Sequence, residues 1–250
     1  VHLFGDAADS EILAGRIHRS LRADLDESSA GARLGVSQGL TFGRIAGAWL
    51  DATSFMSPLK ILVIPGSLRS GSHNVRLAAA AMAELVEAGA DVSLISLADF
   101  PLPIYDGDLE ARSGVPVEAV KLKRLIGIHH GVLLVSPEYN SSPPPLLKNA
   151  LDWVTRVRER DEPAGHVLRG RPFALASAST GRFGGARCLM MLRLMLSGCR
   201  VTVIPTQLSL SFADQAYDDM DRLKHGNDSD MLAALARQLI DVAEQMRQHD

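Results

Sequence analysis

A loop rich in small and hydroxyl-bearing residues follows the first strongly apolar run of the chain, in the stretch "VIPGSLRSGSHN" at residues 63–74. Gly66 and Gly71 have the spacing of a P-loop, but Ser72-His73 stands where that motif requires Lys followed by Ser or Thr. The missing lysine removes the cation that reaches the β- and γ-phosphates of a nucleotide. The loop therefore argues against a nucleoside triphosphatase.

The same loop suits the phosphate of a monophosphate ester. Ser67 and Ser72 offer hydroxyl donors, and Arg69 offers a guanidinium that can bind two phosphate oxygens at once. The helix expected from residue 72 presents free backbone N–H groups and the positive end of its dipole. Asn74 can donate a hydrogen bond or brace the loop. An ordinary helix cap at Ser72 beside a solvated Arg69 remains the alternative.

Alternating strands and helices must position this loop. Short apolar runs without period-two alternation are typical of buried parallel strands, and they occur at 59–64, 91–97, 131–136, 172–178 and 200–204. Helical spacing of apolar residues lies between and after them, at 72–88, 116–128, 145–158, 184–197 and 229–247. The pattern predicts an α/β fold, a flavodoxin-like doubly wound five-stranded parallel sheet of order 2-1-3-4-5 with helices on both faces.

In that strand order the ligand crevice lies between the first and third strands, beyond their carboxyl ends. The loop "PGSLRSGSHN" follows the first strand, and the loop "SPEYNSSPPP" follows the third. The two most unusual polar loops of the chain are therefore expected to meet at one edge of the sheet.

Composition limits the function classes. The 250 residues carry a formal net charge of −3, so the chain lacks the excess of positive charge that is typical of nucleic-acid-binding proteins. The apolar runs are too short for a membrane helix. Cys188 and Cys199 provide neither a disulfide framework nor metal spacing, so we expect reduced thiols in a cytoplasmic protein. The His129-His130 pair is interpreted as a helix end or loop rather than a metal site.

Residues 1–55 differ from the remainder because they contain no lysine and no continuous apolar segment. One amphipathic helix is expected at about 10–25. Our hypothesis divides the chain into an extension over 1–55, disordered or partly helical and dispensable, and a flavodoxin-like domain over 56–250. The alternative is that the extension is an arm that docks a partner.

Three motifs in this order and spacing carry a family resemblance: "GSLRSGSHN", then "SPEYN" followed by "LLKNALDW", then "SASTGRFGGARC". Over about residues 59–210 the chain resembles the NADPH-dependent FMN reductase family, the flavodoxin-like group that includes chromate, azo and quinone reductases. The resemblance implies FMN as cofactor and NADPH or NADH as co-substrate.

The resemblance also implies the cofactor-binding residues. The FMN phosphate would be surrounded by Ser67, Arg69, Ser72 and Asn74. The isoalloxazine and ribityl side would be lined by Pro137, Glu138, Tyr139 and Asn140. The flavin would be closed on its other side by Ser179, Thr180, Gly181 and Arg182. No catalytic side chain and no metal ligand is predicted, because the flavin itself carries out the chemistry.

The predicted function is an FMN-dependent NAD(P)H oxidoreductase with a ping-pong cycle. Hydride would pass from NAD(P)H to FMN, and electrons would then pass to a small-molecule acceptor such as a quinone, flavin, azo compound or metal oxyanion. Relatives suggest a homodimer or homotetramer. One alternative is a flavodoxin-like electron carrier without turnover of its own, and another is a flavin or nucleotide sensor.

The chain departs from the family pattern at Pro145, because a glycine usually stands at this position before "LKN".

Overall fold

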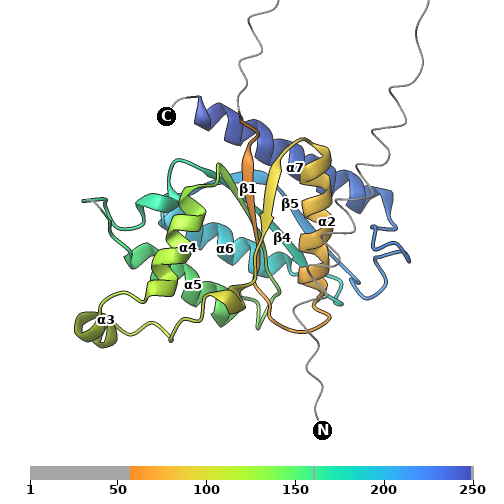
Figure 1. Cartoon of the computed structure of the whole chain (residues 1–250). Helices are drawn as coiled ribbons and strands as arrows, with labels where there is room; N and C mark the ends of the chain where they lie inside the picture. The colour runs from red at the N-terminus through yellow and green to blue at the C-terminus, as the bar shows by residue number, and fades with distance from the viewer. Residues whose placement is uncertain (1–56, 160, 249–250) are drawn as a thin grey trace, which may run out of the picture. The chain divides into compact units, whose positions relative to one another are not determined.

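A computed structural model describes residues 57–159 and 161–248 of the chain (Figure 1). The extension predicted over 1–55, with its expected helix at 10–25, lies outside the described residues. Within them, the first strand starts at Lys60 and the last helix ends at Arg247.

Five parallel strands form one sheet in the order β2-β1-β3-β4-β5. Their bounds are β1 Lys60–Pro65, β2 Asp91–Leu94, β3 Gly131–Val135, β4 Pro172–Ala178 and β5 Thr202–Leu210. Every residue of β3 and β4 is buried, as expected for central strands covered on both faces. The predicted flavodoxin-like topology is confirmed.

Helices cover both faces of the sheet (Figure 1). One face is covered by α2 (His73–Glu87) and α7 (Gly226–Arg247). The other face is covered by α4 (Val117–Gly127), α5 (Pro145–Arg156) and α6 (Ala186–Gly198). The strands are therefore fixed between two apolar layers, and only the loops at their ends are left to build a site.

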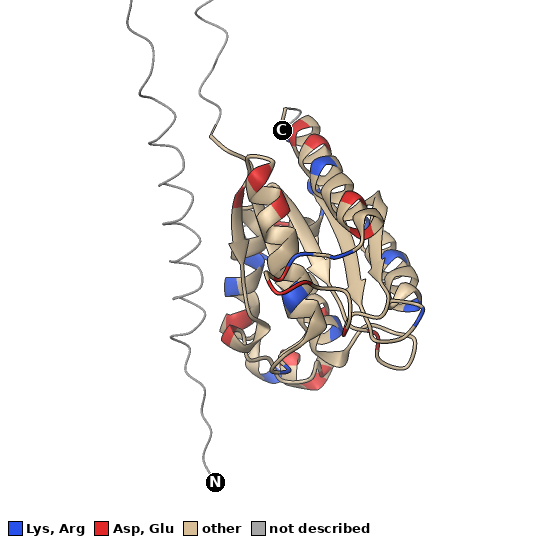
Figure 2. Ribbon diagram, turned by 90° about the vertical axis from the view of Figure 1, so that its right-hand side faces the viewer, with Lys and Arg blue, Asp and Glu red and all other residues tan. Residues whose placement is uncertain are grey.

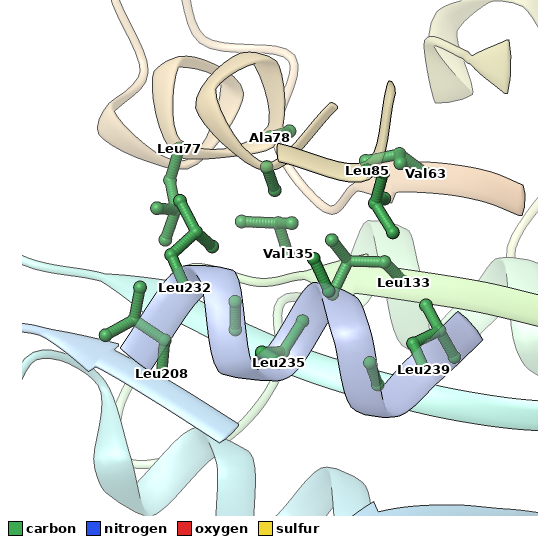
Figure 3. Close-up of a cluster of buried hydrophobic side chains, with 14 of the residues drawn as sticks. Val63, Leu77, Ala78, Leu85, Leu133, Val135, Leu208, Leu232, Leu235 and Leu239 are labelled. Carbon is green, nitrogen blue, oxygen red and sulfur yellow. The ribbon is translucent and has the colours of Figure 1, made fainter. Parts of the chain in front are cut away.

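The core under α7 shows how the sequence pattern produces this layering. Leu232, Leu235 and Leu239 project from one side of α7 toward Leu133 and Val135 of the central strand (Figure 3). Each of these leucines is almost completely buried, which stabilises the fold by about 1.5–3 kcal/mol per side chain. Acidic and basic residues occupy the outward side of the same helix (Figure 2).

Three segments differ from the sequence prediction. The second strand was expected over 91–97, but β2 ends at Leu94 and a 3₁₀ helix begins at Leu97. No helix or strand was expected between residues 97 and 116, but this segment contains a short helix, α3 (Gly107–Ser113), capped by the Asp106 carboxylate. The fifth strand was expected to end at residue 204, but β5 continues to Leu210. Pro205 does not end it, because the pairing of β4 with β5 shifts register there, and a bulge accommodates a residue that lacks an N–H.

The structure also explains Trp153 of the motif "LLKNALDW", Pro145 and the His129-His130 pair. Trp153 is fully buried, and its indole N–H donates to the Pro103 carbonyl at 2.7 Å. Pro145 is the first residue of α5, where the absence of an N–H is harmless. His129 and His130 follow the end of α4, where His129 bonds to Leu125 and Ser93 and His130 accepts the Lys60 N–H.

Candidate cofactor-binding site

A cavity of about 380 Å³ opens at the carboxyl ends of β1, β3 and β4, within the usual size range of small-molecule sites. It is lined by Ser67, Arg69, Ser72, His73, Asn74, Pro137, Glu138, Tyr139, Ala178, Ser179 and Thr180. The structure thus brings together residues from all three loops that the sequence singled out. Of the predicted site residues, Asn140, Gly181 and Arg182 are not part of the lining.

The loop after β1 is held by its own polar groups. The Gly66 N–H donates to the Val135 carbonyl at 2.8 Å, which fixes the start of the loop to β3. The Ser67 hydroxyl accepts the Arg69 N–H at 3.3 Å, and Ser72 caps α2. Ser67 and Ser72 are both buried, whereas Arg69 is exposed. The loop therefore combines fixed hydroxyls with a guanidinium that can reach an incoming anion.

Asn74 braces the loop rather than directing its amide into the cavity. Its Nδ2 donates to the Ala178 carbonyl at 2.9 Å, and its Oδ1 accepts the Ala178 N–H, also at 2.9 Å. Both bonds are buried, so their loss would leave unpaired backbone groups in the interior. Of the two roles that the sequence allowed for Asn74, the contacts favour bracing, which joins α2 to the end of β4.

The loop after β3 contains a tight turn. Tyr139 and Ser142 exchange two backbone hydrogen bonds of 2.9 and 3.0 Å. The two residues between them, Asn140 and Ser141, have φ values of 49° and 66°, the left-handed conformation that the central positions of a type I′ turn require. Asn140 is therefore a turn residue outside the cavity lining, and Tyr139 is half-exposed at the cavity.

Glu138 connects the second loop to the third. Its carboxylate accepts the Cys188 backbone N–H at 3.1 Å and the Arg187 Nε–H at 2.8 Å. Gly185, the N-cap of α6, has no side chain to satisfy the first N–H groups of the helix. The Glu138 carboxylate takes that role, and its negative charge is favourable at a helix N-terminus.

The loop after β4 depends on two glycines. Gly184 has a φ of 55°, and a Cβ there would lie 2.6 Å from the backbone of Ser209. Gly185 has a φ of 84°, and its Cβ would lie 1.8 Å from the Ser177 hydroxyl. The backbone is also held by the Gly181 N–H donating to the Ser179 hydroxyl at 3.2 Å. Only glycine allows α6 to begin so close to the sheet.

Arg182 and Phe183 lie at the exposed tip of this loop. The Arg182 guanidinium carbon is 4.6 Å from the centroid of the Phe183 ring, and that of Arg187 is 5.3 Å from it. The Ser211 hydroxyl donates to the Arg182 carbonyl at 2.8 Å, which fixes the backbone beneath the stacked side chains.

Cys188 lies behind the cavity and is not a nucleophile. Burial raises the pKa of its thiol to about 11, and the nearby Glu138 charge also raises it, although a hydrogen bond with Ser136 acts in the opposite direction. The thiol lies 3.3 Å from the Ser136 hydroxyl and remains protonated at neutral pH. Within residues 57–159 and 161–248, no cluster of three or more His, Cys, Asp or Glu residues could hold a metal ion.

Sequence reasoning did not include two of the lining residues. His73 was considered only as the residue that replaces part of a P-loop, although its place at the start of α2 puts it at the cavity. Ala178 carried no chemical signal because it contributes through its backbone. Its position at the end of β4, opposite the end of β1, was the available indication.

The donor set fits the phosphate and ring of FMN. Buried hydroxyls, an exposed guanidinium and the N-terminus of α2 lie at one part of the cavity, and these groups favour a phosphate. The rigid turn of the second loop and the glycine-rich third loop provide backbone close to the remaining space, as a flat ring requires.

The sequence pattern of the family described as NADPH-dependent FMN reductase matches residues 59–215. The chain belongs to this family. The match spans all five strands and the three loops of the cavity. The resemblance inferred from the three motifs is confirmed, together with the predictions of an oxidoreductase, of FMN and of NAD(P)H dependence.

Two proteins that are similar to this chain in sequence are named as reductases of the same kind. A quinone reductase of Escherichia coli (strain K12) is 39% identical over 139 residues, covering 55% of this chain and 69% of that protein. An NAD(P)H-dependent FMN reductase of Pseudomonas aeruginosa is 36% identical over 167 residues, covering 66% of this chain and 84% of that protein.

A solved structure is similar to three quarters of the chain. The flavoenzyme NAD(P)H:(acceptor) oxidoreductase of Paracoccus denitrificans has a TM-score of 0.61 and 27% identity, covering 75% of this chain and 98% of that chain. Among the helices that the structure describes, none has the length and apolar character needed to cross a bilayer.

Proposed function

We propose that the chain binds FMN in the cavity at the carboxyl ends of β1, β3 and β4 and reduces a quinone-class acceptor with NAD(P)H. The observation that carries the proposal is the convergence of a phosphate-type loop and two backbone-rich loops on one cavity. FMN, when bound, supplies the redox chemistry by taking up hydride and passing electrons on. The protein's part is to hold and orient the reactants.

The loop after β1 is assigned to the phosphate. Ser67 and Ser72 would donate hydroxyl hydrogen bonds, and Arg69 would neutralise the phosphate charge from the solvent side. Asn74 is assigned a positioning role, because both of its amide atoms bond to Ala178. His73 extends the same wall of the cavity as the first residue of α2.

The loops after β3 and β4 are assigned to the isoalloxazine ring of FMN. Pro137, Glu138 and Tyr139 would present backbone groups and one aromatic side chain to it, while the Glu138 carboxylate remains at the start of α6. Ser179 and Thr180 form the facing wall, and Gly181 follows them in the turn of the β4 loop. A half-exposed Tyr139 leaves one part of the site open to an acceptor.

The deciding experiment is an anaerobic half-reaction on the FMN-loaded protein. NADPH and NADH are each mixed with it, and flavin absorbance is followed before a panel of quinone, flavin, azo and chromate acceptors is added. Bleaching by a nicotinamide nucleotide, followed by reoxidation with a quinone, supports the proposal. A protein that does not retain FMN contradicts it, and FMN binding without bleaching indicates an electron carrier instead.

We also propose that the protein is a homodimer or homotetramer. Met190, Met191 and Leu194 form an exposed apolar stripe on α6. An apolar stripe of this kind on a helix is typical of a protein contact. Light scattering after gel filtration measures the mass, and the Leu194→Glu variant is expected to dissociate the assembly. A monomeric wild-type protein would contradict the proposal.

Residues 56–250 are proposed to be sufficient for folding and FMN binding. The five strands and the cavity are built from residues 60–210. Deleting residues 1–55 is expected to leave the melting temperature and FMN content of the protein unchanged. Loss of either would contradict the hypothesis that this segment is dispensable.

A further inference from the structure

We propose that the stacked pair Arg182–Phe183 is the binding site for a phosphate group of the nicotinamide nucleotide. The inference rests on the proposed function, because it concerns the second substrate of the same cavity. It also changes the role of Arg182, which the family resemblance placed around the flavin.

The first observation is the position of the pair. Ser179 and Thr180 line the cavity, and Arg182 follows two residues later, outside the lining but in the same turn. A nucleotide whose nicotinamide lies against the flavin must extend its phosphates out of the cavity, across its rim. The tip of the β4 loop closely follows the lining residue Thr180 in the chain, which makes it a candidate for part of that rim.

The second observation is the balance of charge around Phe183. Two guanidiniums lie over this ring, but Arg187 is ion-paired with Glu138 and its charge is compensated. No carboxylate among the described residues lies within ion-pair distance of Arg182. Arg182 thus provides a net positive charge beside the cavity.

The third observation is that the backbone and the guanidinium of Arg182 are held in place before a ligand binds. Its carbonyl accepts the Ser211 hydroxyl at 2.8 Å, and the turn is closed by the Gly184 N–H donating to the Gly181 carbonyl at 3.1 Å. Stacking on Phe183 orients the flat guanidinium while its N–H groups remain available for hydrogen bonding. A phosphate can therefore bind two of these N–H groups without a large loss of side-chain entropy.

Two phosphate sources share this chemistry, the 2′-phosphate of NADPH and the diphosphate common to NADPH and NADH. The first would give selectivity for NADPH over NADH, whereas the second would assist both nucleotides equally. Comparing the two nucleotides on one variant separates the sources.

The test uses the full FMN-loaded chain with Arg182→Gln, Arg182→Lys and Phe183→Leu. Arg200→Gln is the matched control, because Arg200 is an exposed arginine beyond the opposite end of α6. We expect Arg182→Gln to raise KM for the nucleotide roughly tenfold, as for the loss of one charge-assisted contact, with little change in kcat. Arg182→Lys should retain part of the binding, and Phe183→Leu should weaken it about threefold.

Each outcome decides the proposal. A rise in KM for NADPH alone supports binding of the 2′-phosphate, and an equal rise for both nucleotides supports binding of the diphosphate. Unchanged KM values for both would overturn the proposal. Loss of FMN from Arg182→Gln would also overturn it, because Arg182 would then belong to the flavin site.

A binding measurement separates this inference from the proposed function. Calorimetric titration of the oxidised protein with adenosine 2′,5′-bisphosphate and with inorganic pyrophosphate requires no turnover. Should the wild-type chain oxidise neither nucleotide, the proposed function fails, yet weaker binding of a probe by Arg182→Gln than by Arg200→Gln still supports a phosphate site. Equal binding of both probes by the two variants would overturn it.

Discussion

The loops after β1 and β4 border the same cavity but are built in opposite ways. In the first loop the hydroxyls of Ser67 and Ser72 are buried. In the loop after β4 the backbone is fixed by Gly184 and Gly185, and the side chains of Arg182 and Phe183 remain exposed. The difference suggests a division between a loop that retains a cofactor and a loop that meets a substrate that must leave after each turnover.

The largest expected effect comes from a substitution that prevents the close backbone approach in the loop after β4. Gly184→Ala places a methyl group 2.6 Å from the Ser209 backbone, so β5 or α6 must shift. We expect the free energy of unfolding to fall by roughly 3 kcal/mol, measured by urea denaturation. Gly71→Ala is the matched change in the first loop, where φ is 66° and the space is open, and it should cost about 1 kcal/mol. Equal losses would remove the contrast between the loops.

The next effect concerns the connection between the two loops. Asn74→Ala removes both hydrogen bonds to Ala178 and leaves its buried backbone groups unpaired. The free energy of unfolding should fall by about 2 kcal/mol, and FMN should bind more weakly because the first loop loses its brace. Thermal denaturation with and without FMN measures both quantities. An unchanged stability would mean that solvent or another group satisfies Ala178.

The division of roles is tested most directly by replacing one arginine in each loop with alanine. Arg69→Ala should raise the FMN dissociation constant about tenfold while leaving the melting temperature of the apoprotein unchanged. Arg182→Ala should leave FMN binding as in the wild type. Flavin fluorescence titration compares the two variants. If both variants lose FMN to the same degree, the two loops hold the cofactor jointly.

The smallest effect is expected at Cys188, behind the cavity. Because burial raises the pKa of this thiol to about 11, its reactive thiolate is scarce at pH 8 and increases only as the pH approaches that value. Native protein at pH 8 should therefore resist iodoacetamide at Cys188, as peptide mass spectrometry can show. Cys188→Ala should reduce stability by about 1 kcal/mol and leave kcat unchanged. Rapid labelling would indicate that the start of α6 opens in solution.

The sheet order and the main helices were predictable because buried parallel strands and amphipathic helices have distinct apolar periods. The bulge at Pro205 was not, because the sequence shows a proline but not the register shift that accommodates it. At the site, loop positions followed from topology, whereas side-chain directions did not. Asn74 bonds to a residue 104 positions away, and Glu138 caps a helix that begins 48 residues later, at Ala186.

The bond between Asn74 and Ala178 also has a consequence for the order of events during synthesis. The loop after β1 leaves the ribosome early, but its brace is the last residue of β4. A nascent chain that stops before β4 therefore has the phosphate-loop residues without the contact that fixes them. Because domains form their long-range contacts only once the partner segments are available, the growing chain should acquire flavin only after β4 has emerged and paired with β3.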